Sequence, residues 1–158
     1  MRNLYDTEEF ENAYTYLGHD LGAFWTESQT VFRLWAPTAR EVTLLLYRDG
    51  LGGEPLTSQQ LHPEKNGTWI ARRMGNLKGL YYTYLVNVDG HAKEACDPYA
   101  KAVGVNGQRA MVIDLRETNP AGWTEDRSPF RGKGITDAVL YELHIRDLSM
   151  HRSSHIQN

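Results

Sequence analysis

Cysteine is nearly absent from this sequence, since Cys96 is the only one among 158 residues. A single cysteine excludes an internal disulfide and fits a reducing compartment, so we expect a cytoplasmic protein. Long apolar runs are also missing, and no stretch approaches the ~20 apolar residues that span a bilayer. Residues 1–9 are acidic and lack an apolar core, so they predict no signal peptide. These absences argue against a membrane protein.

A strong charge of either sign is missing as well, because the formal net charge is only −3. Without a basic surplus there is no electrostatic reason to expect nucleic acid or an anionic membrane as a partner. Apolar residues are present at 41%, which argues against disorder, and the length suffices for one domain and some additional chain. Nine Tyr and four Trp suit a packed sandwich or a surface on which sugars stack.

Four Asx-Gly pairs, at residues 49–50, 66–67, 89–90 and 106–107, divide the middle of the chain. Such pairs favour tight β-turns because both positions tolerate positive φ. The segments around them alternate apolar and polar residues, as strands do. The expected strands are residues 30–36, 41–47, 56–61 (an edge strand), 68–74, 81–88 and 110–115. Short strands at this spacing predict an all-β, immunoglobulin-like sandwich over residues 22–116, preceded by an N-terminal segment, residues 1–21.

The composition changes after residue 116. Residues 117–136 combine Pro, Gly and mixed charge, which is typical of a linker. Residues 138–145 then read as one buried strand of a new domain, which spans residues 137–158. A (β/α)8 barrel needs ~250 residues, so this second domain is expected to be incomplete.

Three runs carry a resemblance to a known family. They are YLGHDLG with TVFRLWAPTA (residues 16–22 and 30–39), DPYAKA (97–102), and TNPAGW with YELHIRDLS (118–123 and 141–149). In order and spacing they resemble the N-terminal region of type I pullulanases, debranching enzymes of glycoside hydrolase family 13. The resemblance implies that the sandwich is a module of carbohydrate-binding family 48. It also implies that residues 139–145 are the first strand of the catalytic barrel, and that the parent enzyme hydrolyses α-1,6 branch points.

Catalytic residues are not expected in this chain. A retaining glycosidase needs two carboxylates about 5–5.5 Å apart, and the resemblance places the family's catalytic acids beyond Asn158. Glu142 and Asp147 lie in or beside one strand and are interpreted as structural. We therefore expect the chain alone to be inactive, whether or not its parent is an enzyme, and to need no cofactor.

Sugar binding is the chemistry that a sandwich can supply, because a pyranose ring packs its C–H face on an aromatic ring. Starch-binding relatives use two Trp and a Lys, and this chain has no Trp at the matching places. The candidate α-glucan contacts are Tyr47, Tyr84, His91 and Lys93, which are otherwise ordinary strand and loop residues. Trp35 and Trp69 lie within strands and are interpreted as core.

A second group of residues is expected to contact the chain's own catalytic barrel. Pro98 biases the residue before it to an extended conformation, which lets Tyr99 anchor the loop. The expected interdomain residues are Asp97, Pro98, Tyr99 and Trp123, and the alternative for the first three is a simple turn.

Other motifs indicate little. Cys96 is interpreted as a small buried hydrophobe rather than a nucleophile. Residues 131–136 lack the glycine spacing of a phosphate-binding loop. His151 and His155 have no third ligand nearby, so we expect no metal site. Two functional alternatives stay open: a free-standing α-glucan-binding module and a protein-interaction sandwich.

Overall fold

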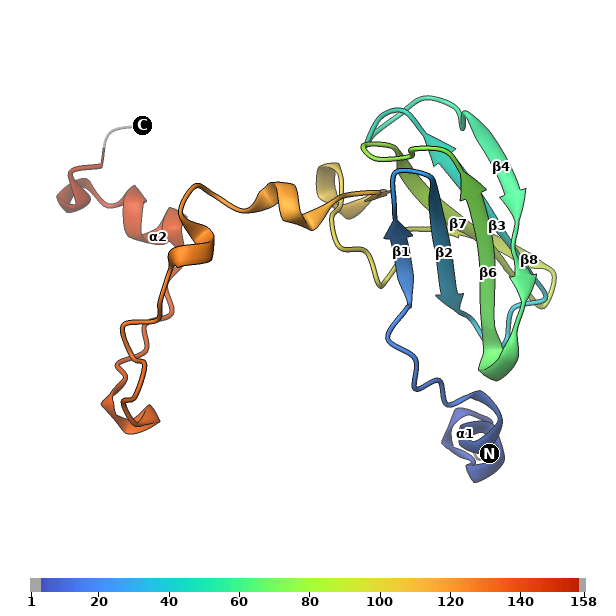
Figure 1. The fold of residues 1–158 in the computed structure, drawn as a ribbon, viewed down its shortest axis with the longest axis horizontal. Coiled ribbons are helices and arrows are strands. Elements are labelled where there is room, and N and C mark those ends of the chain that lie inside the picture. Colours follow the sequence, from blue (N-terminus) through green and yellow to red (C-terminus); the bar gives the residue numbers. More distant parts are fainter. Residues whose placement is uncertain (1–3, 157–158) are drawn as a thin grey trace. The chain divides into compact units, whose positions relative to one another are not determined.

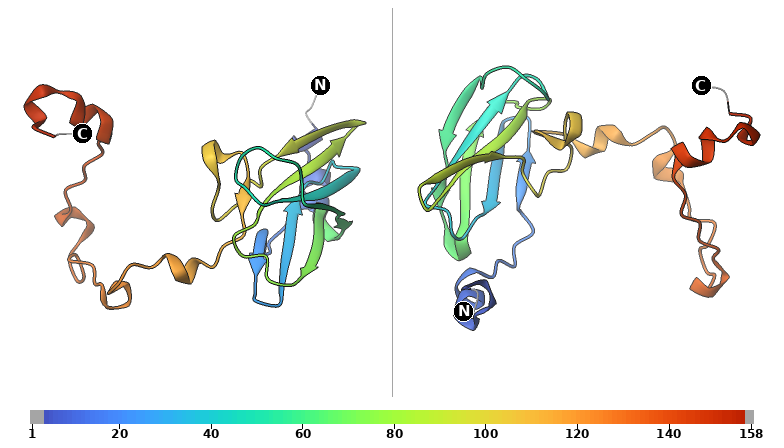
Figure 2. Two further views of the ribbon diagram at one scale, coloured as in Figure 1. Left: turned by 90° about the horizontal axis from the view of Figure 1, so that it is seen from above. Right: turned by 180° about the vertical axis from the view of Figure 1, so that it is seen from behind.

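A computed structural model of the protein describes residues 4–156. The chain divides into two compact units, Met1–Thr118 and Asn119–Asn158 (Figures 1 and 2). Every buried residue of the described chain lies at or before Val112, so only the first unit has a hydrophobic core.

The first unit is a sandwich of two antiparallel sheets, and the predicted all-β sandwich is confirmed. The first sheet has the order β1 (Gly22–Trp25), β2 (Gln29–Trp35), β6 (Thr68–Met74) and β5 (His62–Pro63). The second has the order β4 (Thr57–Gln60), β3 (Glu41–Tyr47), β7 (Tyr81–Val88) and β8 (His91–Ala95). A short strand, β9 (Ala110–Met111), pairs with the start of β7.

The core forms where the alternating strands of the two sheets face each other. Phe32 of β2 meets Tyr82 of β7 edge to face, with ring centroids 5.0 Å apart. The inward residues of β3 are Val42, Leu44 and Leu46, each at most 2% exposed. Fully burying such side chains stabilises a fold by about 1.5–3 kcal/mol each, so this alternation holds the two sheets together.

Helices are short. Helix α1 (Glu8–Tyr14) begins at Thr7, whose side chain accepts a hydrogen bond from the amide of Phe10 at 3.2 Å. Helix α2 (Ile145–Met150) lies in the second unit. Seven 3-10 turns complete the described chain: Leu4–Asp6, Lys65–Gly67, Val105–Gly107, Leu115–Thr118, Trp123–Glu125, Ile135–Asp137 and Arg152–Ser154. The sequence showed no periodicity long enough to predict α1.

Three of the four Asx-Gly pairs adopt the positive φ angles that were expected, with φ of 57° and 72° at Asn66 and Gly67 and 51° and 84° at Asp89 and Gly90. Asp89 and Gly90 form the two-residue turn between β7 and β8. Asp49 and Gly50 are the exception, because no positive φ occurs there. Gly50 is instead crowded by the ring of Tyr81 and by Gly104, so it is a site of close approach.

Two expected strands differ from the structure. The strand expected over residues 110–115 ends at Met111, because Val112 exchanges hydrogen bonds with the Gly79–Leu80 turn and Asp114 binds Arg116. The strand expected over residues 138–145 is not formed in the described chain. There Ile145 begins α2, and Leu140 and Tyr141 are 93% and 87% exposed. No neighbouring strand is present to pair with this segment, so its backbone gains nothing from an extended ladder.

Candidate functional site

The four expected glucan-binding residues do not form one surface. In the β3–β7 and β7–β8 ladders, Tyr47 lies opposite Tyr81, Tyr84 opposite Ala95, and Lys93 opposite Val86. Because side chains alternate along a strand, Tyr47 is on the outer face of the second sheet and Tyr84 is on the inner face. Tyr47 and Tyr84 therefore do not share a surface, and α-glucan binding by the expected residues stays a prediction.

Burial removes Tyr84 from any sugar surface. Its side chain is 1% exposed, and its ring packs against Tyr82 in the core with centroids 5.7 Å apart. Its hydroxyl has no hydrogen-bond partner among the described residues. Burial raises the pKa of Tyr84 well above its ordinary value. Tyr84 is thus a core residue, as the inward alternation of β7 requires.

Tyr47 is also buried, at 3% exposure, but it belongs to a polar cluster on the outer face. Its hydroxyl donates to Glu94 Oε1 at 2.6 Å, and the Arg109 guanidinium covers its ring at 3.5 Å from the centroid. Thr83 also donates to Glu94 Oε1, at 2.7 Å. The ring of Tyr47 consequently supports Glu94 and Arg109 and offers no face to a sugar.

Arg109 fixes the loop after β3. It donates from Nη1 to the carbonyls of Asp49 (2.7 Å) and Gly52 (2.6 Å), and from Nη2 to that of Gly53 (3.3 Å). Burial opposes the charge of Glu94, yet the hydrogen bonds from Tyr47 and Thr83 and the charge of Arg109 lower its pKa below the ordinary value. Glu94 is thus held as a carboxylate in a fixed orientation.

A depression of about 640 Å³ lies over this cluster. Its lining includes the polar side chains of Thr83, Glu94, Asn106, Gln108 and Arg109 and the apolar side chain of Leu51. His91 and Lys93 are exposed on β8, the strand that also carries Glu94, but neither lines the depression. Sequence reasoning missed Glu94 and Arg109, because residues 91–95 show no apolar alternation and an arginine in a loop gives no signal.

The expected interdomain residues have separate surroundings. Asp97 is 3% exposed and accepts hydrogen bonds from the Tyr82 hydroxyl (2.7 Å) and the Tyr99 amide (2.8 Å), so it is bound inside the sandwich. Pro98 is exposed, and Tyr99 is half-buried. Trp123 is 56% exposed and begins a 3-10 turn in the second unit. Asp97, Pro98 and Tyr99 belong to one loop of the first unit, while Trp123 belongs to the second unit.

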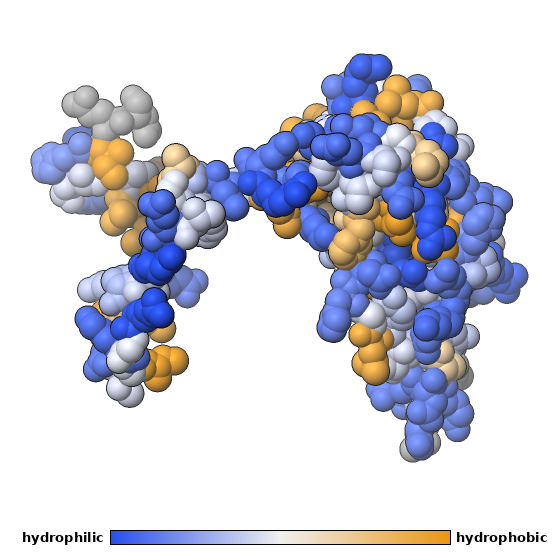
Figure 3. Space-filling view, viewed as in Figure 1, coloured by the Kyte–Doolittle hydropathy of each residue, from blue (hydrophilic) through white to orange (hydrophobic). Residues whose placement is uncertain are grey.

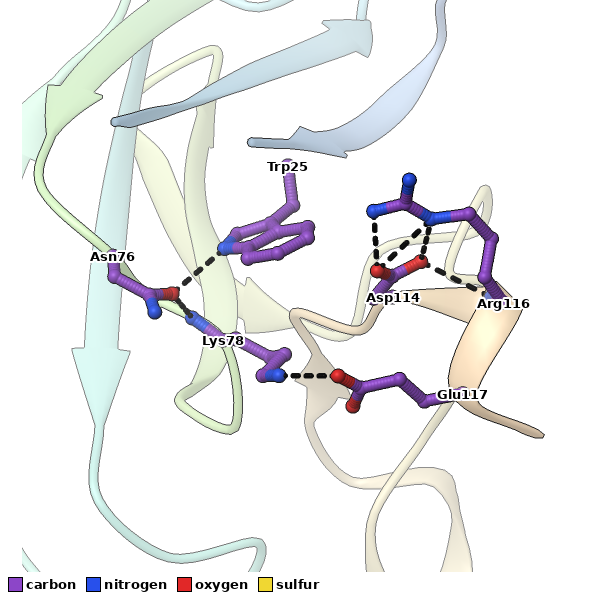
Figure 4. A network of polar contacts seen from close by, with 6 residues as sticks. All are labelled: Trp25, Asn76, Lys78, Asp114, Arg116 and Glu117. Carbon is purple, nitrogen blue, oxygen red and sulfur yellow. Dashed lines mark hydrogen bonds and ion pairs between the residues drawn. The ribbon is translucent and has the colours of Figure 1, made fainter. Parts of the chain in front are cut away.

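A polar network holds the end of the first unit against the sandwich (Figure 4). Trp25 donates from Nε1 to Asn76 Oδ1 at 2.9 Å, and Lys78 binds Glu117 at 2.7 Å (Figure 4). Arg116 contacts both carboxylate oxygens of Asp114 and lowers the pKa of that carboxyl to about 2. This network is the last part of the first unit before the chain enters the second.

The surroundings of Cys96 do not favour a reactive thiol. Burial and the charge of Asp97 raise the pKa of the Cys96 thiol, which disfavours the nucleophilic thiolate. Among residues 4–156, no group of three His, Cys, Asp or Glu side chains could hold a metal ion. Within the same range, no helix is long and apolar enough to cross a membrane.

Comparison with protein families matches residues 20–100 to carbohydrate-binding module 48 (isoamylase N-terminal domain). The matched segment contains β1 to β8 and the loop that holds Asp97. It therefore covers both sheets except β9, and it includes Glu94 of the polar cluster, while Arg109 lies after it.

Comparison with individual proteins gives longer matches. The pullulanase of Bacillus subtilis (strain 168) is 35% identical over 152 residues, which are 96% of this chain and 20% of that protein. A mutant pullulanase from Paenibacillus barengoltzii, solved with maltotriose, is 46% identical with a TM-score of 0.86, over 93% of this chain and 23% of that one. The same enzyme was also solved with maltohexaose and α-cyclodextrin (46% identity, TM-score 0.86, 93% and 22% coverage). This chain thus spans about a fifth of the length of these relatives.

Proposed function

The chain belongs to the carbohydrate-binding module 48 family, and from this membership we propose that it is the non-catalytic N-terminal part of a pullulanase-type debranching enzyme. The parent would hydrolyse α-1,6-glucosidic bonds of starch or glycogen. The immunoglobulin-like sandwich would then serve a catalytic barrel that begins within this chain. The observation that carries this proposal is the match of 96% of the chain to a pullulanase sequence.

Residues 117–136 are proposed as the linker and residues 137–158 as the start of the barrel. Apolar side chains of the second unit are exposed to an extent that folded domains avoid, as the orange side chains of Figure 3 illustrate. Val139, Leu140, Tyr141, Leu143 and Ile145 are between 57% and 93% exposed. A barrel strand has its neighbours on both sides, and their presence would cover these side chains.

Catalysis by the parent is tested with the natural reading frame. Sequencing downstream of the Asn158 codon should reveal a barrel with spaced Asp and Glu residues, and the encoded enzyme should release reducing ends from pullulan. The 158-residue chain should release none, because the resemblance to the family places both catalytic carboxylates beyond Asn158. A stop codon after Asn158 in the natural gene would overturn the proposal.

A cytoplasmic location is also proposed, because the sequence has a single cysteine, Cys96. Fractionation of the native cells tests this location.

The sandwich itself is proposed to bind α-glucan in the depression over Glu94 and Arg109. Both groups are held in place by other residues before any ligand arrives, so binding would lose little side-chain entropy. Glucose hydroxyls can donate to the carboxylate and accept from the guanidinium. No aromatic side chain lines this depression, so we expect weak binding, with Kd of about 1 mM.

Calorimetric titration of the chain with maltoheptaose tests this binding. The Glu94→Gln variant should bind about fivefold more weakly, because it replaces a charged acceptor while keeping the shape of the side chain. Arg40→Ala is the matched control, since Arg40 forms an exposed ion pair with Asp89 far along the ladder and lines no part of the depression. No heat at millimolar maltoheptaose would exclude a glucan-binding function and favour a protein-interaction role.

A further inference from the structure

A second cavity, of about 380 Å³, opens beside helix α1 on the outer face of the first sheet. Its wall is rich in aromatic side chains: Tyr5, Phe10, Tyr14, Tyr16, Trp35 and Tyr99. The depression over Glu94 has none. The rings that sugar recognition favours are therefore gathered in a different place from the polar cluster.

Helix α1 forms one wall of this cavity, and Trp35 holds the helix to the sandwich. The Trp35 indole N–H donates to the carbonyls of Tyr14 (2.8 Å) and Asn66 (3.1 Å), and the Asn66 amide donates to the carbonyl of Ala13 at 3.4 Å. Phe10 is buried, and its ring lies 4.8 Å from that of Tyr14. The aromatic wall is thus held together by contacts that need no ligand.

The opposite wall is also fixed. The Tyr16 hydroxyl donates to Asp20, which in turn accepts from Arg33 Nε at 2.9 Å. The Tyr99 amide is bound to Asp97, and its carbonyl lies so close to Gly22 that a Cβ there would meet it at 2.7 Å. These constraints keep Tyr16 and Tyr99 in place on the side facing α1.

The lining matches a neutral sugar. Its rings offer apolar faces for the C–H face of a pyranose, and the exposed Glu11 and Thr15 add a carboxylate and a hydroxyl that bond sugar hydroxyls. Among residues 4–156, Glu11 is the only charged residue of this lining, and its negative charge disfavours phosphates and other anions. The volume lies in the range of about 300–1,000 Å³ that small-ligand sites occupy.

We propose that this aromatic cavity binds a glucosyl unit of an α-glucan and is a second site, separate from the depression over Glu94. The proposal rests on the α-glucan-binding function proposed above. It adds a site partly outside the family match, since Tyr5 to Tyr16 precede residue 20.

Tryptophan indole N–H signals in a two-dimensional NMR spectrum of the full chain test the proposal. The chain has four Trp, and of these only Trp35 lines the aromatic cavity. Single Trp→Phe variants at positions 25 and 123 assist the assignment. Titration with maltotriose should shift the Trp35 signal progressively and saturably, while the Trp123 signal stays in place. Backbone amides of residues 91–95 and 105–109 report the depression over Glu94 in the same spectra.

Three variants, at positions 11, 12 and 15, sharpen the test. Thr15→Trp fills the cavity and should abolish the Trp35 response, while amides near Glu94 still respond. The matched control Asn12→Trp adds the same side chain to an exposed position of α1 that does not line the aromatic cavity, and it should leave the response unchanged. Glu11→Gln should weaken the response about fivefold, because a charged hydrogen-bond acceptor is lost.

The outcomes separate the two proposals. A silent Trp35 signal with responding amides near Glu94 overturns the second site and leaves the proposed function standing. Silence at both sites overturns both proposals. A Trp35 signal that shifts with protein concentration before any glucan is added identifies a second copy of the chain as the occupant, which also overturns the glucan assignment. A response retained in the Thr15→Trp variant does the same.

Discussion

At the scale of the residue, Asp97 is a carboxylate inside the sandwich where water cannot solvate its charge. Burial raises the pKa of Asp97 above its ordinary value of 3.8, although hydrogen bonds from Tyr82 and the Tyr99 amide act in the opposite direction. The folded protein therefore binds this proton more tightly than the unfolded chain does. The contribution of Asp97 to stability is complete below pH 3.8 and is lost as the pH rises through the folded-state pKa.

As the pH rises from about 4 to 7, we expect Asp97→Asn to become more stable relative to the unaltered chain, because Asn has no proton to lose. Urea denaturation at several pH values measures this difference. Tyr82→Phe should instead lose stability more steeply than the unaltered chain as the pH rises, because it removes a hydrogen bond that stabilises the carboxylate. Parallel pH curves for all three proteins would contradict this account.

Single residues also show where sequence reasoning succeeds. The inward set of β3 follows directly from alternation, and Trp69 is in the core as expected. Trp35 was also expected in the core, but it is only partly buried and lines the aromatic cavity beside α1. The functional roles of Tyr47 and Tyr84 could not be obtained in this way. Whether a strand tyrosine is covered depends on residues far along the chain, such as Arg109, which lies 62 positions after Tyr47 and stacks on its ring.

At the scale of the element, Gly67 shows how a turn and a helix constrain each other. It adopts φ of 72°, and a Cβ there would meet Pro37 Cβ at 2.6 Å and the ring of Tyr14 at 3.0 Å. Gly90 in the β7–β8 turn has φ of 84° but open space around it. Comparing substitutions at the two glycines therefore distinguishes the cost of backbone strain from the cost of steric contact.

Gly90→Ala should destabilise the chain by about 1 kcal/mol, from the left-handed backbone alone. Gly67→Ala should cost roughly 1–3 kcal/mol more, because Pro37 and the end of α1 must also shift. Chemical denaturation measures both variants. Equal losses would mean that α1 does not press on this turn.

The network of Figure 4 gives a second prediction at this scale. Lys78→Ala should speed hydrogen exchange at the Glu117 amide, which donates to the Asp114 carbonyl at 3.1 Å, without lowering the unfolding midpoint. The ion pair is exposed to solvent, so it orders a local turn and contributes little to global stability. Arg40→Ala is the control, and unchanged exchange in Lys78→Ala would exclude this role.

Strand positions were the most predictable elements. The expected ranges 41–47, 68–74 and 81–88 coincide with β3, β6 and β7. Alternation is clear in the first and last of these ranges and weaker in 68–74, and an Asx-Gly turn signal lies beside each. Strand β8 was missed because residues 91–95 face solvent and carry charge. Its position depends on the turn at Asp89–Gly90 and on pairing with β7, which residue polarity does not reveal.

At the scale of the whole molecule, the resemblance to pullulanases is confirmed for the N-terminal region that this chain matches. Stability is concentrated in the first unit, because the described second unit contains no buried residue. We expect a chain ending at Thr118 to unfold cooperatively, at a midpoint within experimental error of that of the full chain. Thermal unfolding followed by circular dichroism makes the comparison. A clearly lower midpoint would show that residues after 118 stabilise the sandwich.

The outer edge of the second sheet has a consequence for the protein at high concentration. Strand β8 pairs with β7 on one side, and within the described chain no strand pairs with its other side. It presents His91, Lys93 and Glu94 at that edge, all exposed. Another molecule that added a strand there would have to bring the charges of Lys93 and Glu94 out of water. The edge that carries the polar cluster thereby resists the growth of ordered aggregates.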